Sequence, residues 1–415
     1  MRATKIDRVR GDLVRPQSET PRQSTGGQDS LSRSDPNLNK ERIMLKVAVV
    51  GMGGIGNIHA SCHRNNPTAE LVAVCDVIKA KADEAGEKHD CEVFYSLAEV
   101  LDAHPDIDIV DVTTGGNENG SWHYEPTMQA LRAGKNVLVE KPISNDINQA
   151  REMVKLATEK NLYLGCNLNH TFTKPADEAK ALSDEGKLGE PIYCLHRMGF
   201  PGGESTYPGP ATNANFEGFR YAHVKAFLAH PFSIMRYFCG DIVKVQAFMG
   251  QPGFRRHAND PMVSINSIHV LFANGTVGYL FSQRGDATMG LGGWWSVEVG
   301  GSKGTFCIEN CVEKLTFYPT PGAEGAAAPE KLKLGQSPAP VVTDTGETDF
   351  QLTFQNRIDA FLEDVDHAVP KDQLRASGRD ALATLEYTWA AIESYEQDGI
   401  VIRPHPLPPE ARRPE

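Results

Sequence analysis

Short apolar runs alternate with amphipathic segments in the first part of the chain. The apolar runs typical of strands span residues 46–50, 71–75, 107–113, 137–139 and 162–166. Before the last run, Met153, Leu156 and Ala157 share one face of a helix predicted over residues 147–160. Strands separated by helices of this length favour a parallel, doubly wound sheet that is covered on both faces. We therefore predict an α/β domain over residues 45–166.

The pattern changes after residue 167, where strand-like runs follow one another more directly. Strands are predicted over residues 242–248, 263–272, 277–282, 296–299 and 305–308, and helices over 174–184, 222–237, 352–367 and 379–397. Asn274-Gly275 separates two of these strands and predicts a tight hairpin, because both residues tolerate positive φ. These features predict a second α/β domain over residues 167–404 with an antiparallel or mixed open sheet.

The two ends of the chain lack this periodicity. Residues 1–44 are rich in Ser, Arg, Gln, Asn, Pro and Gly, and we expect a disordered tail there. Residues 405–415 form a second, short tail. Met44 stands just before the first strand, so we hypothesise that it is the true start, a point that the mass of the native protein would decide.

Composition narrows the classes of partner. The formal net charge is −12, and residues 1–44 hold nine basic and six acidic residues, so the remainder carries −12 − 3 = −15. An acidic body repels phosphate backbones, which argues against nucleic acid as a partner. No apolar run approaches the ~20 residues of a membrane span. The eight cysteines are scattered, which favours a reduced, cytoplasmic protein, and no Cys/His cluster predicts a metal site.

The segment Gly51-Met52-Gly53-Gly54-Ile55-Gly56 matches the pattern G-x-G-x-x-G between a predicted strand and a helix. Gly51 allows the tight turn, Gly53 lets the backbone approach a pyrophosphate, and Gly56 lets the helix pack against its strand. The helix amides, with Gly54 and Ile55 at their start, then receive the phosphate charge. The segment therefore predicts a dinucleotide site.

Asp76 ends the second predicted strand, about 20 residues after the glycine turn. Its carboxylate would bind the ribose hydroxyls of the cofactor and repel a 2′-phosphate, which favours NAD. Lys79 stands close enough to accommodate a phosphate, so NADP is the alternative cofactor.

Glu140-Lys141-Pro142 follows the apolar run 137–139. This position is the carboxyl edge of the predicted parallel sheet, where such folds bind ligands. Pro142 restricts the preceding backbone and removes one amide donor, so the segment directs one ammonium group at the cofactor. Thr114 ends the neighbouring strand, and we place it with Glu140 and Lys141 in the cofactor site.

These residues carry a resemblance to a known family. The chain resembles the Gfo/Idh/MocA oxidoreductases over roughly residues 45–404, in the glycine turn followed by His59-Ala60, in residues 130–137 leading into Glu140-Lys141-Pro142, in Asn274-Gly275 and in residues 299–304. The resemblance implies a Rossmann domain followed by an α/β domain with a large open-faced, mostly antiparallel sheet. It also implies hydride transfer to NAD from a secondary hydroxyl of a sugar, polyol or glycoside.

The resemblance further implies a homo-oligomer, a dimer or a tetramer, that forms through the open sheet. The sequence offers alternating apolar positions for that contact at Val263, Ile265, Ile268, Val270 and Phe272.

In such enzymes the lysine of the Lys-Pro pair lies between cofactor and substrate, and a helix of the second domain supplies Asp-x-x-x-His. Here Lys141 and His230 match the lysine and the histidine, whereas Ala226 stands where the family usually has aspartate. The chain thus belongs to a divergent branch. We interpret His230 as the general acid/base and Lys141 as the group that orients the substrate and stabilises its charge. The reverse assignment is the alternative.

Three further residues are candidates. His223 shares a helix face with His230, so we hypothesise a role in substrate binding or proton relay, with simple packing as the alternative. Asn169 and His170 follow the last strand of the first domain, and we expect them to contact cofactor and substrate respectively.

Two other functions remain open at this point. One is a glycoside-cleaving enzyme that oxidises its substrate transiently and recycles its NAD, which would release no net NADH. The other is a non-catalytic cofactor sensor, although the presence of both Lys141 and His230 argues against it.

Overall fold

A computed structural model of the chain describes residues 44–115, 122–200, 202–206, 219–290, 292–321, 335 and 339–409. The predicted N-terminal tail up to residue 43 lies outside these residues, as does the C-terminal tail from residue 410. Both sheets described below belong to one compact unit, Ile43–Glu415.

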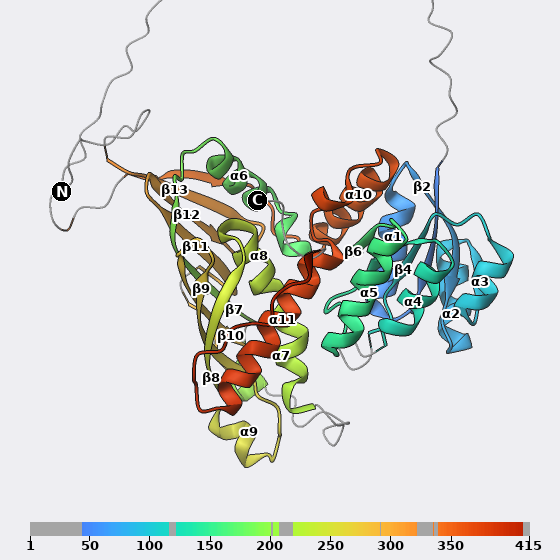
Figure 1. The fold of residues 1–415 in the computed structure, drawn as a ribbon. Coiled ribbons are helices and arrows are strands. Elements are labelled where there is room, and N and C mark those ends of the chain that lie inside the picture. The colour runs from blue at the N-terminus through green and yellow to red at the C-terminus, as the bar shows by residue number, and fades with distance from the viewer. Residues whose placement is uncertain are drawn as a thin grey trace, which may run out of the picture. The chain divides into compact units, whose positions relative to one another are not determined.

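The first sheet has six parallel strands, and it confirms the predicted doubly wound architecture (Figure 1). In spatial order the strands are β3 (Glu92–Phe94), β2 (Ala69–Cys75), β1 (Leu45–Val50), β4 (Ile109–Val112), β5 (Asn136–Val139) and β6 (Leu164–Cys166). Every strand predicted in this half is present. The three-residue strand β3 was missed because it is too short for its alternation to be seen. The chain order reverses between β1 and β4, so a crevice opens at the carboxyl ends of these strands.

Helices connect these strands and cover the first sheet. They are α1 (Gly54–Asn65), α2 (Lys79–His89), α3 (Leu97–Ala103), α4 (Tyr124–Arg132) and α5 (Ile147–Glu159). Local sequence explains where several begin. Ser96 and Glu99 form a capping box at α3, and the Asp146 side chain accepts two amides at the start of α5. In contrast, Gly53 gives α1 no side-chain cap, so its first amides are left for another acceptor.

The second sheet has eight strands and is antiparallel except for one pair. In spatial order the strands are β14 (Val341–Asp344), β13 (Lys314–Pro319), β12 (Gly304–Glu309), β11 (Trp295–Gly301), β7 (Pro191–Gly199), β10 (Val277–Gln283), β9 (Ile265–Phe272) and β8 (Ile242–Gly250). Only β7 and β10 run parallel among these pairs. The hairpin predicted at Asn274-Gly275 joins β9 to β10, and Gly275 has φ +89°. Strands β7, β13 and β14 were not predicted.

The remaining helices of five or more residues within the described ranges are α6 (Lys174–Asp184), α7 (Ala222–Phe227), α8 (Ala229–Cys239), α9 (Gly253–His257), α10 (Leu352–Asp366) and α11 (Gly378–Glu396). The predicted helix over residues 222–237 is therefore two helices that meet at Leu228. Pro231 has no amide hydrogen to donate to the Phe227 carbonyl, which removes one bond of the helical ladder at this point. No helix in the described part of the chain is both long and apolar enough to cross a membrane.

The predicted contact between copies used the wrong face of β9. Ile268, Val270 and Phe272 are almost fully buried within this chain, in the same core as Met235 of α8. Since side chains alternate across a strand, these residues face the helices and cannot face a second copy.

Helix α10 returns to the first sheet, although it follows the second sheet in sequence. Its residues Ile358, Phe361 and Leu362 share one apolar core with Val47 of β1 and Leu138 of β5. Figure 1 shows α10 beside α1, and the Gln355 amide donates to the Cys62 carbonyl there, at 3.1 Å.

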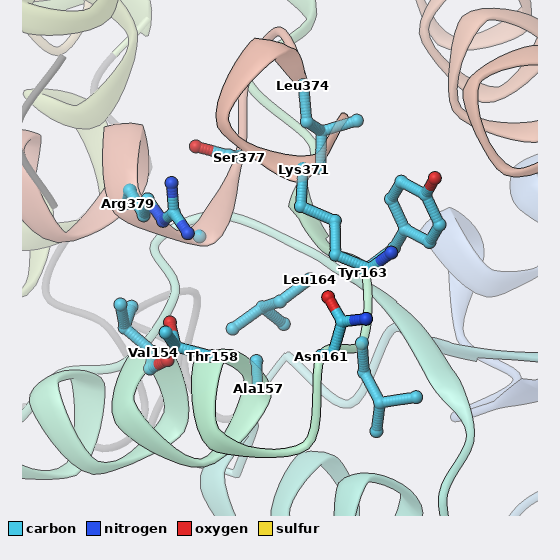
Figure 2. A pocket seen from close by; sticks show the side chains of 12 residues that line it. Val154, Ala157, Thr158, Asn161, Tyr163, Leu164, Lys371, Leu374, Ser377 and Arg379 are labelled. Atoms are coloured by element: carbon cyan, nitrogen blue, oxygen red, sulfur yellow. Dashed lines mark hydrogen bonds between the residues drawn. The ribbon is translucent and has the colours of Figure 1, made fainter. Parts of the chain in front are cut away.

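Strand β6 and the chain before α11 are also tied together. The Cys166 amide donates to the Ala376 carbonyl at 2.8 Å, and Arg357 of α10 donates to the Cys166 carbonyl at 3.0 Å. Figure 2 shows the small cavity, about 120 Å³, that remains between α5, residues 161–164 and the start of α11. It is too small for a dinucleotide, so the ligand site lies elsewhere.

Substitution of Gly165 can test the packing of β6 against α10. A methyl group on Gly165 would lie 2.5 Å from Arg357 Nη2 and 2.8 Å from the Phe361 ring, whereas one on Gly250 would meet nothing within 4 Å. We expect Gly165→Ala to lower the free energy of unfolding by about 1–3 kcal/mol, as overpacking does, and Gly250→Ala to leave it almost unchanged. Urea titrations of the two variants would show this, and equal stabilities would contradict the described packing.

Candidate active site

A cavity of about 610 Å³ opens at the carboxyl ends of the first sheet. Its wall includes Ile55 of α1, Thr113 after β4, and Glu140 and Lys141 after β5. The second half of the chain closes it with side chains such as His230 of α8. The cavity therefore lies where the topology of an open α/β sheet favours ligand binding.

The glycine turn fits a bound pyrophosphate. Gly51 has φ +100°, and a Cβ there would lie 2.8 Å from the Thr114 amide nitrogen. A Cβ on Gly56 would lie 2.0 Å from the Gly51 carbonyl oxygen, so close packing requires glycine at both positions. Gly53 and Gly54, in contrast, face open space within 4 Å. The two open glycines and the uncapped start of α1 are what an approaching phosphate requires.

Asp76 lies directly beside this turn. One carboxylate oxygen accepts the Met52 amide at 2.8 Å, and the other accepts the Ile78 amide at 2.8 Å. The carboxylate is thereby held at the end of β2, where it can meet an adenosine ribose. Lys79 places its ammonium group 4.7 Å from the centre of the Tyr95 ring, so this cation already has a partner other than a 2′-phosphate.

A buried network of charges lies beneath Lys141. His59 of α1 contacts Asp111 of β4 through Nδ1 at 2.9 Å and Glu140 through Nε2 at 3.1 Å. Neither the His59 nor the Asp111 side chain is exposed. Although burial lowers the pKa of His59, the two carboxylates outweigh it and raise the pKa to about 10. His59 is therefore an imidazolium that bridges two buried carboxylates.

This network also positions Lys141. The other oxygen of Glu140 accepts the Lys141 amide at 3.1 Å, and Asn167 donates to the oxygen that His59 contacts. Burial opposes ionisation of Glu140, but its hydrogen bond with His59 and the charge of that ring keep its pKa below the usual value. The peptide bond between Lys141 and Pro142 is cis. His123 donates from Nδ1 to the Pro142 carbonyl at 2.7 Å, which anchors the next residue of the same segment.

Two histidine rings stack on each other in the wall of the same cavity. His170, in the short helix η2 (Asn169–Thr171), lies parallel to His230 with ring centres 3.9 Å apart. Trp295 donates its indole N–H to Nδ1 of His170 at 3.0 Å, so the proton of neutral His170 sits on Nε2. Burial, with the nearby charge of Lys141, holds the pKa of both rings well below the ordinary value. Both rings are therefore neutral at physiological pH.

The other predicted site residues divide into two groups. Asn169 lines the cavity, and it also donates to the Thr353 hydroxyl at 2.7 Å. Thr114 and His223 are not among the residues that line it. The Thr114 hydroxyl donates to the Trp122 carbonyl at 2.7 Å, and His223 is buried with its ring 4.6 Å from that of Phe227. Their roles as ligand contacts stay predictions.

Sequence reasoning missed two parts of the site. His59 was predicted only as part of a motif. It was not paired with Asp111, which lies on β4, 52 positions later in the chain. Sequence reasoning also missed Phe200, Phe227 and Phe350 of the cavity wall, because each comes from a different part of the chain.

Comparisons with known proteins agree with this geometry. Residues 45–168 match a family described as "Oxidoreductase family, NAD-binding Rossmann fold", and residues 176–307 match the "GFO/IDH/MocA C-terminal domain". The inositol 2-dehydrogenase of Rhizobium meliloti (strain 1021) is 23% identical over 360 residues, which are 84% of this chain and 96% of that protein. The D-glucoside 3-dehydrogenase of Escherichia coli (strain K12) is 32% identical over 164 residues, which are only 38% of this chain and 45% of that protein.

Two solved structures show the same fold. An NAD-binding oxidoreductase from Klebsiella pneumoniae matches with a TM-score of 0.73 and 19% identity over 88% of this chain and 100% of its own. A levoglucosan dehydrogenase in complex with NADH and L-sorbose matches with a TM-score of 0.72 and 17% identity over 88% of this chain and 99% of its own. At such identities the likeness carries the fold alone.

The open glycine turn, Asp76 and the cavity beside Lys141 define the class of protein as an NAD-binding oxidoreductase with a Rossmann domain. The second sheet and the two family matches narrow this class to one family. The chain belongs to the Gfo/Idh/MocA family of oxidoreductases.

The glycine turn can be tested by a matched pair of variants. In Gly53→Ala the new methyl group meets no protein atom within 4 Å and φ is −78°, so we expect an unchanged melting temperature. The methyl group would obstruct the pyrophosphate, and the dissociation constant for NAD should rise roughly tenfold or more, a loss of about 1.4 kcal/mol. Gly56→Ala should instead lower the melting temperature without cofactor. Calorimetric titration with NAD and thermal melts would separate the two, and unchanged NAD affinity in Gly53→Ala would contradict the assignment.

The charge on His59 predicts a dependence of stability on pH. Its folded pKa of about 10 lies above the ordinary 6.5, so its contribution is complete below pH 6.5 and is lost as the pH rises toward 10. We expect the free energy of unfolding to fall by on the order of 1 kcal/mol per pH unit between pH 7 and 9. His59→Gln should be less stable at pH 7 and should lack this part of the slope.

The exposed residue His269 of β9 offers the control, because His269→Gln should keep the wild-type slope. Urea titrations at pH 7, 8 and 9 would measure all three proteins. Parallel slopes for wild type and His59→Gln would show that His59 is not a buried cation.

Proposed function

We propose that this enzyme oxidises a secondary hydroxyl of a sugar, polyol or glycoside with NAD, and that Lys141 and His230 act on that hydroxyl. The observation that carries the proposal is that Lys141, His230 and His170 line the same cavity, next to the glycine turn. The names of the relatives, an inositol 2-dehydrogenase and a D-glucoside 3-dehydrogenase, support the substrate class.

The residues present fit the cofactor. Gly53, Gly54 and the first amides of α1 would hold the pyrophosphate, and Asp76 would hold the adenosine ribose. When bound, NAD accepts the hydride of the alcohol carbon. The chain's own side chains must then bind the alcohol oxygen and remove its proton.

His230 suits proton removal. Because its ring is neutral, it has a free lone pair on one nitrogen at physiological pH. Burial, with the neighbouring His170 and Lys141, makes the protonated ring unfavourable and weakens His230 as a base, so the step relies on Lys141 to stabilise the substrate oxygen as its proton leaves. Its ring is held in place by stacking on His170.

Lys141 suits the alcohol oxygen. Glu140 accepts its amide and His123 anchors Pro142, so the segment that carries the lysine is supported on both sides. An ammonium group placed at the reacting oxygen stabilises the negative charge that develops as the proton leaves. Ala226 supplies no carboxylate to orient His230, so Lys141 is the charged group on which this step depends.

We also propose that copies of the enzyme associate through the uncovered face of the second sheet. Leu195, Phe248 and Val277 are exposed, at 44%, 56% and 56%. They stand on strands β7, β8 and β10 in the positions that alternate with the buried ones.

The proposal predicts that both Lys141 and His230 are needed for turnover. Lys141→Ala and His230→Asn should each lower kcat roughly 100-fold or more, because each removes a group that acts on the reacting hydroxyl. NAD affinity should stay within about threefold in His230→Asn. Absorbance of NADH during turnover of a panel of sugars, inositols and glycosides measures the effect. His405→Asn is the control, because His405 is exposed and does not line the cavity.

Several outcomes would contradict the proposal. Glycoside cleavage without net NADH would favour the enzyme that recycles its cofactor. Turnover that Lys141→Ala leaves unchanged would exclude the role given to the lysine. NAD binding without any turnover would favour the sensor.

A further inference from the structure

Aromatic side chains form one continuous wall in the cavity. The ring centres of Phe227 and Phe200 are 5.2 Å apart, those of Phe200 and Trp294 are 6.4 Å apart, and those of Trp294 and Phe350 are 5.4 Å apart. These four residues, called the aromatic wall below, are the last residue of α7, the residue after β7, the residue before β11 and a residue just before α10. Four separate segments therefore converge to place rings against one space.

The aromatic wall lies next to the two stacked histidines, His170 and His230. His170, which stacks on His230, has its ring centre 5.4 Å from that of Phe350 and 6.3 Å from that of Trp294. A molecule whose hydroxyl reaches Lys141 and His230 therefore extends along these rings. The cavity volume of about 610 Å³ lies in the range of roughly 300–1,000 Å³ that holds drug-sized ligands.

The chemistry of the wall does not suit a small polyol alone. Inositol or a free hexose carries hydroxyl groups on all sides, and each one that is buried without a hydrogen bond costs free energy. Among the four rings of the wall, the indole N–H of Trp294 is the one hydrogen-bonding group. A flat apolar group would instead gain from contact with the rings.

Phe200 points to what the wall contacts. It is 46% exposed, whereas its neighbour Phe227 is 5% exposed, so a large apolar side chain stands open to solvent at this cavity. Covering this surface with an apolar group would remove it from water, which is favourable in proportion to the area covered.

We propose that the substrate is a glycoside with an aromatic aglycone, and that the aromatic wall is the aglycone subsite. The sugar ring then lies at Lys141, His230 and His170, and the aglycone lies against Phe200 and Trp294. The inference rests on the proposed function, because it takes the reacting hydroxyl to be that of a sugar.

The test compares pairs of substrates that differ only in the aglycone. Phenyl and methyl glycosides of glucose, galactose, mannose and xylose, in both anomeric forms, are supplied with NAD while NADH formation is followed. For the sugar that is turned over, kcat/KM for the phenyl glycoside should exceed that for the methyl glycoside at least tenfold. Myo-inositol should be a poorer substrate than the phenyl glycoside.

Two variants show whether Phe200 causes the preference for phenyl glycosides. Phe200→Ala should raise KM for the phenyl glycoside and reduce its advantage over the methyl glycoside to within about threefold. Val342→Ala is the control, since Val342 is also an exposed apolar residue but stands on the edge strand β14, outside the cavity wall. It should leave both substrates unaffected.

The outcomes separate this inference from the proposed function. Turnover without preference for phenyl glycosides, or a preference that Phe200→Ala leaves intact, would overturn the subsite and leave the dehydrogenase proposal standing. If myo-inositol or a free sugar is turned over and no glycoside is, the subsite fails while the dehydrogenase proposal stands. If nothing is turned over, the dehydrogenase proposal fails, and calorimetric titration of the NAD-loaded protein still decides the subsite. Binding of phenyl over methyl glycosides that Phe200→Ala abolishes would support it, and equal binding would overturn it.

Discussion

The active site depends on one buried cation. His59 lies between Asp111 and Glu140, and the side chains of His59 and Asp111 are not exposed. Each of these buried charges is therefore stabilised by the others. Three elements, α1, β4 and the end of β5, meet at this ring. The helix that begins at the glycine turn is thus joined to the segment that carries Lys141. The glycine turn and Lys141 are held in one geometry by these ionised groups, and the packing of apolar groups alone would not fix their relative position as sharply.

The cavity next to this cation has a polar end and an aromatic wall. Its inner end has the ammonium group of Lys141 and two stacked neutral imidazoles, and its wall beyond His170 is aromatic. Charge at the inner end suits the step in which an alcohol loses its proton, whereas an apolar wall excludes water from it and adds contact area. Because Ala226 adds no carboxylate, Glu140 is the one acidic side chain among the described residues of the cavity wall, and it also accepts the Lys141 amide.

The sequence predicted most of the first domain because its signals are local. Five strands, the glycine turn and the Asn274-Gly275 hairpin follow from apolar runs and from residues that tolerate positive φ. Short strands such as β3 and β14 carry too few alternating positions to be recognised. The His59 network could not be predicted, since it joins residues far apart in the chain whose charges are stabilised only once they are buried together. The proposed contact at Ile268 and Val270 failed for a related reason, as alternation identifies two faces but not which one the helices cover.

The return of α10 to the first sheet has a consequence for how this enzyme can be altered. Ile358 and Phe361 complete the core around Val47 and Leu138, although the second sheet and its helices lie between them in sequence. A cofactor domain cut at the end of β6 would expose that core to water. The chain is therefore not a pair of exchangeable modules, and a hybrid made with a relative's cofactor domain must import the matching surface of α10 as well.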